Sequence, residues 1–158
     1  MIFLPAMLKA QVPAASSISI NVSANIVSNS PVELTTLNNL IVRGNYSGMK
    51  DFYISPISSP DAGLMRAKGR PNSQARITYL MEEVISDTIA TGKIILKYEM
   101  SGNSDRVQRA SKLIDTGEAI LNFGDDGLFY LWIGCHLDLS QATAGKYNGQ
   151  FTLEIVYI

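Results

Sequence analysis

Cys135 and His136 are the only cysteine and the only histidine of the chain, and they are neighbours. A thiol beside an imidazole suggests a nucleophile with its base, or two ligands of one metal ion. In a strand, however, successive side chains point to opposite faces, which prevents shared ligation, and no other base is evident. Cys135 shares its parity with Ile133 and Leu137, so we expect a small core residue there. The sequence therefore predicts no catalytic residue, no metal ligand and no cofactor.

Asp125 and Asp126 lie between Gly124 and Gly127. Short polar residues flanked by glycine are typical of a tight hairpin turn, because they tolerate unusual backbone angles. A calcium loop would need about six oxygen ligands and a longer acidic pattern than these two residues supply. We therefore expect a turn at this position.

Tyr130 and Trp132 share one parity of a long strand predicted for residues 128–139. Two aromatic rings on one face can form a platform for a sugar, but the ordinary use of such rings is to pack against a second sheet or a neighbouring subunit. The spacing alone does not separate these uses. Tyr130 and Trp132 are thus the candidate ligand platform of the chain.

The charge of the chain excludes some partners. Charged residues account for 17% of the sequence and the formal net charge is −1. No basic stripe is interleaved with aromatic residues, so we expect no nucleic-acid partner. Arg106, Arg109 and Lys112 are interrupted by Asp105 and Asp115, which favours a solvated face over an anion site. No run of about eighteen apolar residues occurs, so no transmembrane segment is predicted.

The elements that position these residues are strands. Ile18, Ile20 and Val22 alternate with polar residues, a period of two that is typical of a strand with one buried face. Further segments with strand character are 51–55, 63–68, 76–81, 93–100, 118–123, 128–139 and 150–158. Turn signals rich in glycine, proline and asparagine separate them. We predict an all-β fold, an immunoglobulin-like antiparallel β-sandwich of about seven to nine strands that covers residues 17–158.

Residues 104–115 are the exception to this pattern. Val107, Ala110 and Ile114 could line one face of a short helix, and a plain loop is the alternative.

Residues 1–16 start with an apolar stretch and end in small residues. They read as the remnant of a secretory signal peptide, which predicts a secreted protein. Apolar residues also alternate from Ile2 to Val12, so a retained segment that donates a strand is a second interpretation. Pro5 and Pro13 count against a central strand in this segment.

The C-terminal third carries the most specific pattern. A glycine, an aromatic residue and a second glycine precede alternating hydrophobic residues up to the penultimate position. The residues concerned are Gly145, Tyr147, Gly149, Phe151, Leu153, Ile155 and Tyr157. This pattern resembles a family of secreted bacterial β-sandwich domains that is related to spore coat protein U and to chaperone-usher pilins, the subunits of fimbriae. The resemblance extends over roughly 17–158.

The resemblance implies a structural function. In chaperone-usher pilins the sandwich lacks its seventh strand, and the resulting groove receives a strand from a periplasmic chaperone and later from a neighbouring subunit. The chain would then be a subunit of a bacterial surface filament or coat, with further copies of itself, a chaperone and an outer-membrane usher as partners. The seven residues above would form the assembly strand, opposite Ile18, Ile20 and Val22. The single cysteine departs from many such pilins, which join their first strands by a disulfide.

The last strand also has a physical consequence of its own. If Phe151, Leu153 and Ile155 point inward, the strand presents a free hydrogen-bonding edge unless an earlier strand covers it. A free edge predicts donor-strand exchange between subunits. A fold that closes within one chain would instead favour a monomeric secreted or cell-surface module, an adhesin that recognises glycan or protein through its loops.

Overall fold

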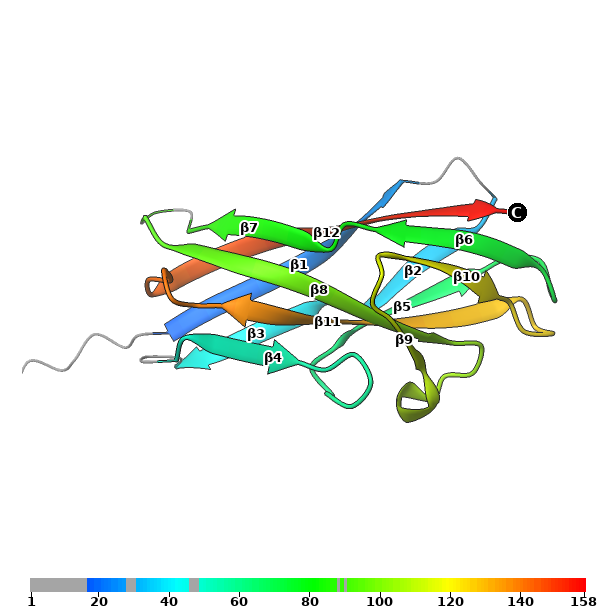
Figure 1. The fold of residues 1–158 in the computed structure, drawn as a ribbon, viewed down its shortest axis with the longest axis horizontal. Coiled ribbons are helices and arrows are strands. Elements are labelled where there is room, and N and C mark those ends of the chain that lie inside the picture. The colour runs from blue at the N-terminus through cyan, green and yellow to red at the C-terminus, as the bar shows by residue number, and fades with distance from the viewer. Residues whose placement is uncertain (1–16, 28–30, 46–48, 88, 90) are drawn as a thin grey trace, which may run out of the picture.

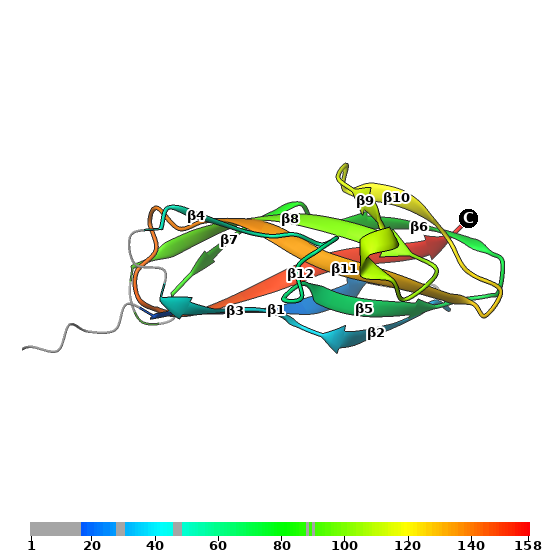
Figure 2. The ribbon, with the colours of Figure 1, turned by 90° about the horizontal axis from the view of Figure 1, so that it is seen from below.

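The computed structural model describes residues 17–27, 31–45, 49–87, 89 and 91–158. These residues form two β-sheets that face each other, and the molecule is elongated along its strands (Figures 1 and 2). The described part contains twelve strands and one short 3-10 turn. The segment 1–16, predicted as a signal remnant or a donor segment, lies outside the described residues.

The first sheet has five strands in the order β10-β6-β12-β1-β3. Their bounds are β1 Ser17–Val27, β3 Leu40–Asn45, β6 Gln74–Tyr79, β10 Glu118–Asn122 and β12 Gly145–Tyr157. The pair of β1 and β12 is parallel, and the other neighbours are antiparallel. A parallel pair cannot be joined by a tight hairpin. Here its two strands come from opposite ends of the chain.

The second sheet has the order β2-β5-β11-β8-β7, with β4 beside β11 and β9 beside β8. Their bounds are β2 Glu33–Asn38, β4 Asp51–Ile54, β5 Gly63–Lys68, β7 Glu82–Ser86, β8 Lys93–Asn103, β9 Lys112–Ile114 and β11 Leu128–Asp138. β11 is the central strand of this sheet. It pairs with β8 along one edge and with β5 and then β4 along the other.

The core lies between the two sheets and is built from alternate residues of each strand. Ile20, Ile77 and Phe151 enter it from the first sheet, and Leu96 and Leu131 from the second, all of them buried. Each such side chain contributes about 1.5 to 3 kcal/mol by leaving water. The alternation seen in the sequence is therefore the pattern of a sandwich with a dry interior and a polar exterior.

The all-β sandwich predicted from the sequence is confirmed, but the number of strands is larger than expected. Four strands were not predicted, namely β2, β3, β7 and β9. β2 and β3 follow each other directly yet lie in different sheets, and so do β6 and β7. The chain thus passes from one sheet to the other at these points, which divides a long extended segment into two short strands.

The short helix considered for residues 104–115 does not form. The structure has a 3-10 turn at Gln108–Ala110, followed by strand β9. Pairing with β8 gives the backbone of β9 its hydrogen-bond partners and buries Ile114, while Val107 stays exposed. In the described part of the chain, no helix has the length and apolar character that a membrane crossing requires.

Candidate functional site

Strand β12 is flanked on both sides by segments of the same chain. Along one edge it pairs in parallel with β1, from Gly145 opposite Ile18 to Glu154 opposite Val27. Along the other edge its C-terminal half pairs with β6, with Ile155 opposite Ile77. The free edge predicted for the last strand is therefore wrong for this structure, because the first strand of the chain occupies it.

Strand β7 covers the N-terminal half of the β6-facing edge of β12. Asp87, which follows β7, forms an isolated bridge with Tyr147. The Glu83 carboxylate accepts the Gln150 N–H, at 3.1 Å from each oxygen. The same carboxylate accepts the Tyr98 hydroxyl at 2.7 Å. A charged side chain thus satisfies an edge amide that would otherwise pair with another strand.

The predicted assembly strand faces inward as expected. Tyr147, Phe151, Leu153 and Ile155 are buried, and Tyr157 is half-buried. These side chains therefore belong to the core of this chain, and their use in assembly stays a prediction.

Close neighbours limit the space at the two glycines of the assembly strand. A Cβ at Gly145 would collide with the carboxylate of Asp87, and one at Gly149 would lie 3.3 Å from Glu83. Gly145 thus makes room for the Asp87 carboxylate, whereas a Cβ at Gly149 would be in tight contact with Leu96 and Tyr98, at 3.2 Å from each.

Tyr147 fixes the turn before β12. Its hydroxyl donates to the Thr143 carbonyl at 2.8 Å and accepts the Thr143 N–H at 3.0 Å. A tyrosine that bonds back to the backbone a few residues upstream is a known stabilising corner of β-sandwiches. This contact explains the aromatic residue between Gly145 and Gly149 without reference to assembly.

We expect Tyr147→Phe to lower the free energy of unfolding by about 1 to 3 kcal/mol, because it removes two hydrogen bonds to the Thr143 backbone, each worth about 0.5 to 1.5 kcal/mol. The matched control is Tyr157→Phe, which loses only the hydrogen bond from Arg70 N–H to the more exposed Tyr157 hydroxyl. Urea unfolding measures both. An equal loss for the two variants would contradict the corner assignment.

The first strand also lies where its alternation predicts. The side chains of Ile18, Ile20 and Val22 are buried in the core, and β1 itself lies between β12 and β3 in the first sheet. Val22 is opposite Gly149 in β12 and Leu40 in β3. β1 therefore takes the place that a donated strand was expected to fill.

The aromatic platform predicted at Tyr130 and Trp132 is not exposed. Trp132 is 5% exposed and Tyr130 is half-buried. The loop after β4 crosses this face of β11, since a Cβ at Gly134 would lie 2.7 Å from Pro56. Ser101 and Gln108 both donate to the Pro56 carbonyl, at 3.1 and 3.0 Å, and hold the loop there. Trp132 is thus buried on a face of β11 that this loop partly covers.

A different aromatic pair lies on the outer face of the second sheet. Tyr53 of β4 stacks on His136 of β11, with ring centroids 4.1 Å apart. Glu99 of β8 accepts the Tyr53 hydroxyl at 2.6 Å and lies 3.1 Å from His136 Nε2. Partial burial and then the hydrogen bond to Glu99 raise the pKa of Tyr53. Glu99 therefore holds two exposed rings in a fixed orientation.

Cys135 and the acidic pair Asp125 and Asp126 have structural roles in this fold. Cys135 is fully buried, and burial raises the pKa of its thiol to about 12, so the reactive thiolate is suppressed. Asp126 accepts the Leu128 N–H at 2.9 Å, which makes the acidic pair part of a turn. No group of three or more His, Cys, Asp or Glu residues within the described ranges is arranged to hold a metal ion.

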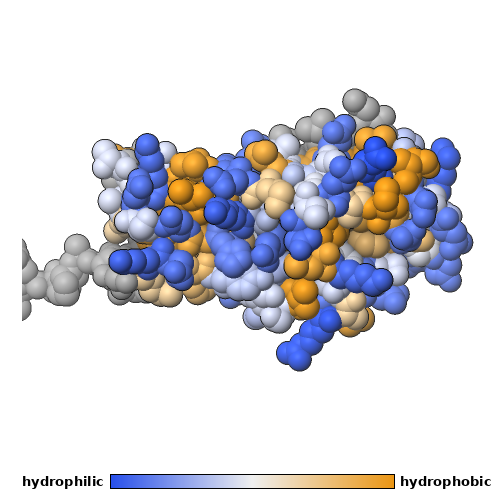
Figure 3. All heavy atoms as spheres, viewed as in Figure 1, coloured by the Kyte–Doolittle hydropathy of each residue, from blue (hydrophilic) through white to orange (hydrophobic). Residues whose placement is uncertain are grey.

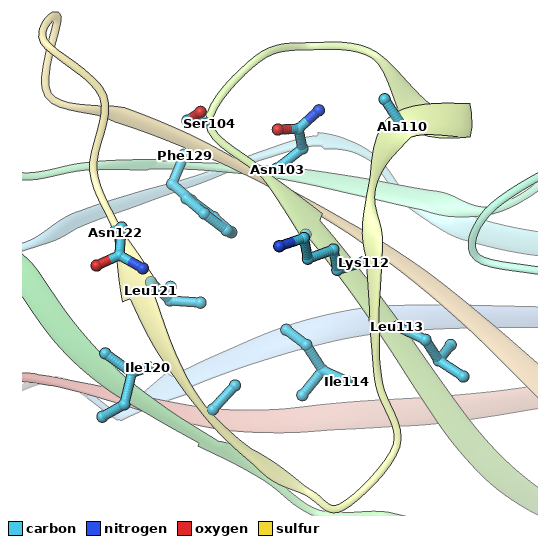
Figure 4. A pocket seen from close by; sticks show the side chains of 12 residues that line it. Asn103, Ser104, Ala110, Lys112, Leu113, Ile114, Ile120, Leu121, Asn122 and Phe129 are labelled. Atoms are coloured by element: carbon cyan, nitrogen blue, oxygen red, sulfur yellow. The ribbon is translucent and has the colours of Figure 1, made fainter.

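A groove of about 370 Å³ lies between β10, an outer strand of the first sheet, and β9 with the end of β8 in the second (Figure 4). We call it the β9–β10 groove. Its apolar lining includes Ile114, Leu121 and Phe129. Its polar lining is Asn103, Ser104, Lys112 and Asn122. The Phe129 ring lies against the β8 backbone, because Gly102 leaves no Cβ in its path.

Strands β9 and β10, which line the groove, lie in the half of the molecule that carries the C terminus (Figures 1 and 2). The space-filling view shows hydrophobic surface over this half of the face, interrupted by hydrophilic side chains (Figure 3). Leu113 and Ile120 are among the exposed large hydrophobic residues. The groove could not be predicted from the sequence, because β9, which forms one of its sides, was not predicted.

Comparison with models of known protein families finds no match to this chain. Comparison with curated proteins also finds no match.

Proposed function

We propose that the chain is a cell-surface or secreted β-sandwich of bacteria that acts as a binding module and not as an enzyme. The observation that carries this proposal is the position of β1, which pairs with β12 inside the same chain. The apolar strand that was expected to await a partner therefore has one already. A domain completed in this way folds as a monomer and exposes its loops and edges for recognition.

Two surfaces support a binding function. The β9–β10 groove combines an apolar lining with amide, hydroxyl and ammonium groups, the mixture that is typical of recognition sites. The stacked pair of Tyr53 and His136 offers a fixed aromatic surface on another face. Tyr53 and His136 come from strands distant in sequence. The groove is lined by residues between 102 and 129, which β8, β9, β10 and β11 bring together.

A structural subunit of a fimbrium or coat is the second candidate function. The order of the first sheet favours it, because β1 is the first described strand and lies between two others. A first strand supplied by a neighbouring copy would make the same contacts, and a chain of such exchanges would form a filament. In this candidate the donated element is β1, and copies of the chain, a chaperone and an usher would be its partners.

The mass of the purified protein separates the two candidates. We expect a single-chain mass in native mass spectrometry, and one band at that mass in SDS gels both before and after boiling. A ladder of unboiled species that collapses on heating would reject the monomeric module and support strand exchange between subunits.

A further inference from the structure

We propose that the β9–β10 groove binds an extended peptide segment of a partner protein, which adds as a short strand to the edge of β10 and carries an acidic residue beside an apolar one. This inference rests on the proposed binding module and names the class of its partner. It requires three properties of the groove. They are a free backbone edge, an apolar lining for one side chain, and a cation without a partner.

The hydrogen bonds of β10 show which of its residues face β6. At one end of the pair, Tyr79 N–H donates to the Gly117 carbonyl at 2.9 Å. At the other end, Phe123 N–H donates to the Ser73 carbonyl at 3.0 Å. In an antiparallel pair, alternate residues direct both backbone groups to the same neighbour. The odd-numbered residues of β10 therefore bond to β6.

The even-numbered residues of β10 turn their backbone groups away from β6. Thr116 donates its hydroxyl to the Glu118 carbonyl. For Ile120 and Asn122, no backbone hydrogen bond on this side is found among the described residues. β10 is the last strand of its sheet, so this edge is a template for one more strand.

The lining of the groove suits one apolar side chain of such a strand. Successive side chains of an added strand point to opposite faces, so one set would enter the groove. There it would meet Leu121 from β10, Ile114 from β9 and Phe129 from β11. Tyr79 donates its hydroxyl to the Ile114 carbonyl, which ties β6 to β9 beside the groove.

Lys112 determines the charge of the peptide. Its side chain extends from β9 toward β10 across the groove (Figure 4). It has neither an ion pair nor a hydrogen bond within the ranges that the structure describes. Asn122 accepts from Gln74 through its amide oxygen, which leaves its amide N–H₂ available as a second donor. Two donors beside an apolar lining favour a carboxylate next to a hydrophobic residue.

The test uses a display library of random peptides of about six residues, roughly 20 Å when extended. The library is panned on the full-length protein, and the affinity of the recovered peptides is then measured on the Ile120→Pro variant. Proline removes one outward N–H of β10 without touching the bonds to β6, and edge strands tolerate it. Ile120→Thr is the matched control, because it changes the side chain and keeps the N–H. Lys112→Glu tests the charge separately.

We expect recovered peptides to combine apolar and acidic residues. Their affinity should fall about tenfold in Ile120→Pro and in Lys112→Glu, the effect of about 1.4 kcal/mol, and change little in Ile120→Thr. Hydrogen exchange gives an independent readout on the unmodified chain. The Ile120 and Asn122 amides should exchange much faster than those of Ala119 and Leu121, and slow down when peptide is bound.

Three outcomes would overturn the peptide site. They are the recovery of no peptide, binding that is unchanged in both Ile120→Pro and Lys112→Glu, and fast exchange at Ile120 that no peptide slows. Binding of an oligosaccharide array with amide shifts at Asn103 and Asn122 would assign the groove to glycan instead. A monomer without peptide binding rejects this inference alone, whereas a heat-sensitive ladder rejects the monomeric module.

Discussion

Replacing Ile155 with Asp is expected to prevent folding. Ile155 is fully buried near the C-terminal end of β12, opposite Ile77 of β6. An ionised carboxylate there would have no partner, and the loss of the apolar side chain adds to that cost. We expect a loss of about 4 kcal/mol or more, against a total stability of about 5 to 15 kcal/mol for a domain. Circular dichroism and urea unfolding measure the effect.

Val156→Asp is the control for this prediction. Val156 is the next residue of the same strand, but it is 42% exposed and points to the opposite face. Its replacement should change the free energy of unfolding by no more than about 0.5 kcal/mol. A folded Ile155→Asp protein with normal stability, or equal losses in both variants, would mean that the inward face of β12 is wrongly assigned.

Removing residues 1–27 is expected to have an effect of similar size. The deletion takes away β1, which covers one edge of β12 and buries Ile18, Ile20 and Val22. Several large apolar side chains would become exposed to water, at a cost in stability of about 1.5 to 3 kcal/mol each. The edges of β12 and β3 would also lose the strand that pairs with them. We expect the truncated protein to aggregate or to stay unfolded, as seen by size-exclusion chromatography.

A synthetic peptide of residues 17–27 should restore the truncated protein to a soluble, folded complex. The control peptide carries Ser in place of Ile18, Ile20 and Val22, which keeps the backbone bonds and removes the buried side chains. We expect no rescue by this peptide. A truncated chain that unfolds cooperatively as a monomer without any peptide would contradict the assigned role of β1.

Periodicity predicted which face of each long strand is buried. The parity of Cys135 placed it in the core, and the alternation of Phe151, Leu153 and Ile155 placed them inward, as the structure has them. These inferences succeed because a strand directs alternate side chains to opposite faces whatever its neighbours are. The all-β class followed from the same signal, repeated along the chain.

Periodicity did not predict which strands are neighbours. The pairing of β1 with β12 joins residues from opposite ends of the chain, and alternation is the same for a strand that pairs within the molecule or outside it. The free edge expected for β12 failed for this reason. Packing was one of the two uses left open for Trp132, and it is buried, but periodicity gave no sign that a loop after β4 lies on that face of β11.

The stacked aromatic pair depends on contacts that are distant in sequence, and the groove depends on a strand that was not predicted. Glu99 brings together Tyr53 and His136 from two other strands. The β9–β10 groove exists because β9 forms in a segment for which a helix or a loop was expected. Short strands with few apolar residues leave little signal in sequence, so the features next to them could not be predicted.

Isotope-filtered NMR tests most directly whether β1 and β12 belong to one molecule. Chains labelled with ¹⁵N and chains labelled with ¹³C are unfolded, mixed and refolded together. Asn21 and Asn148 are opposite each other in the parallel pair, so their protons should give cross-peaks. If each sandwich is completed by its own β1, these cross-peaks should join protons of the same chain, and none should join a ¹⁵N-labelled chain to a ¹³C-labelled one. Cross-peaks between differently labelled chains would show that β1 is exchanged between molecules, and would contradict the self-completed sandwich.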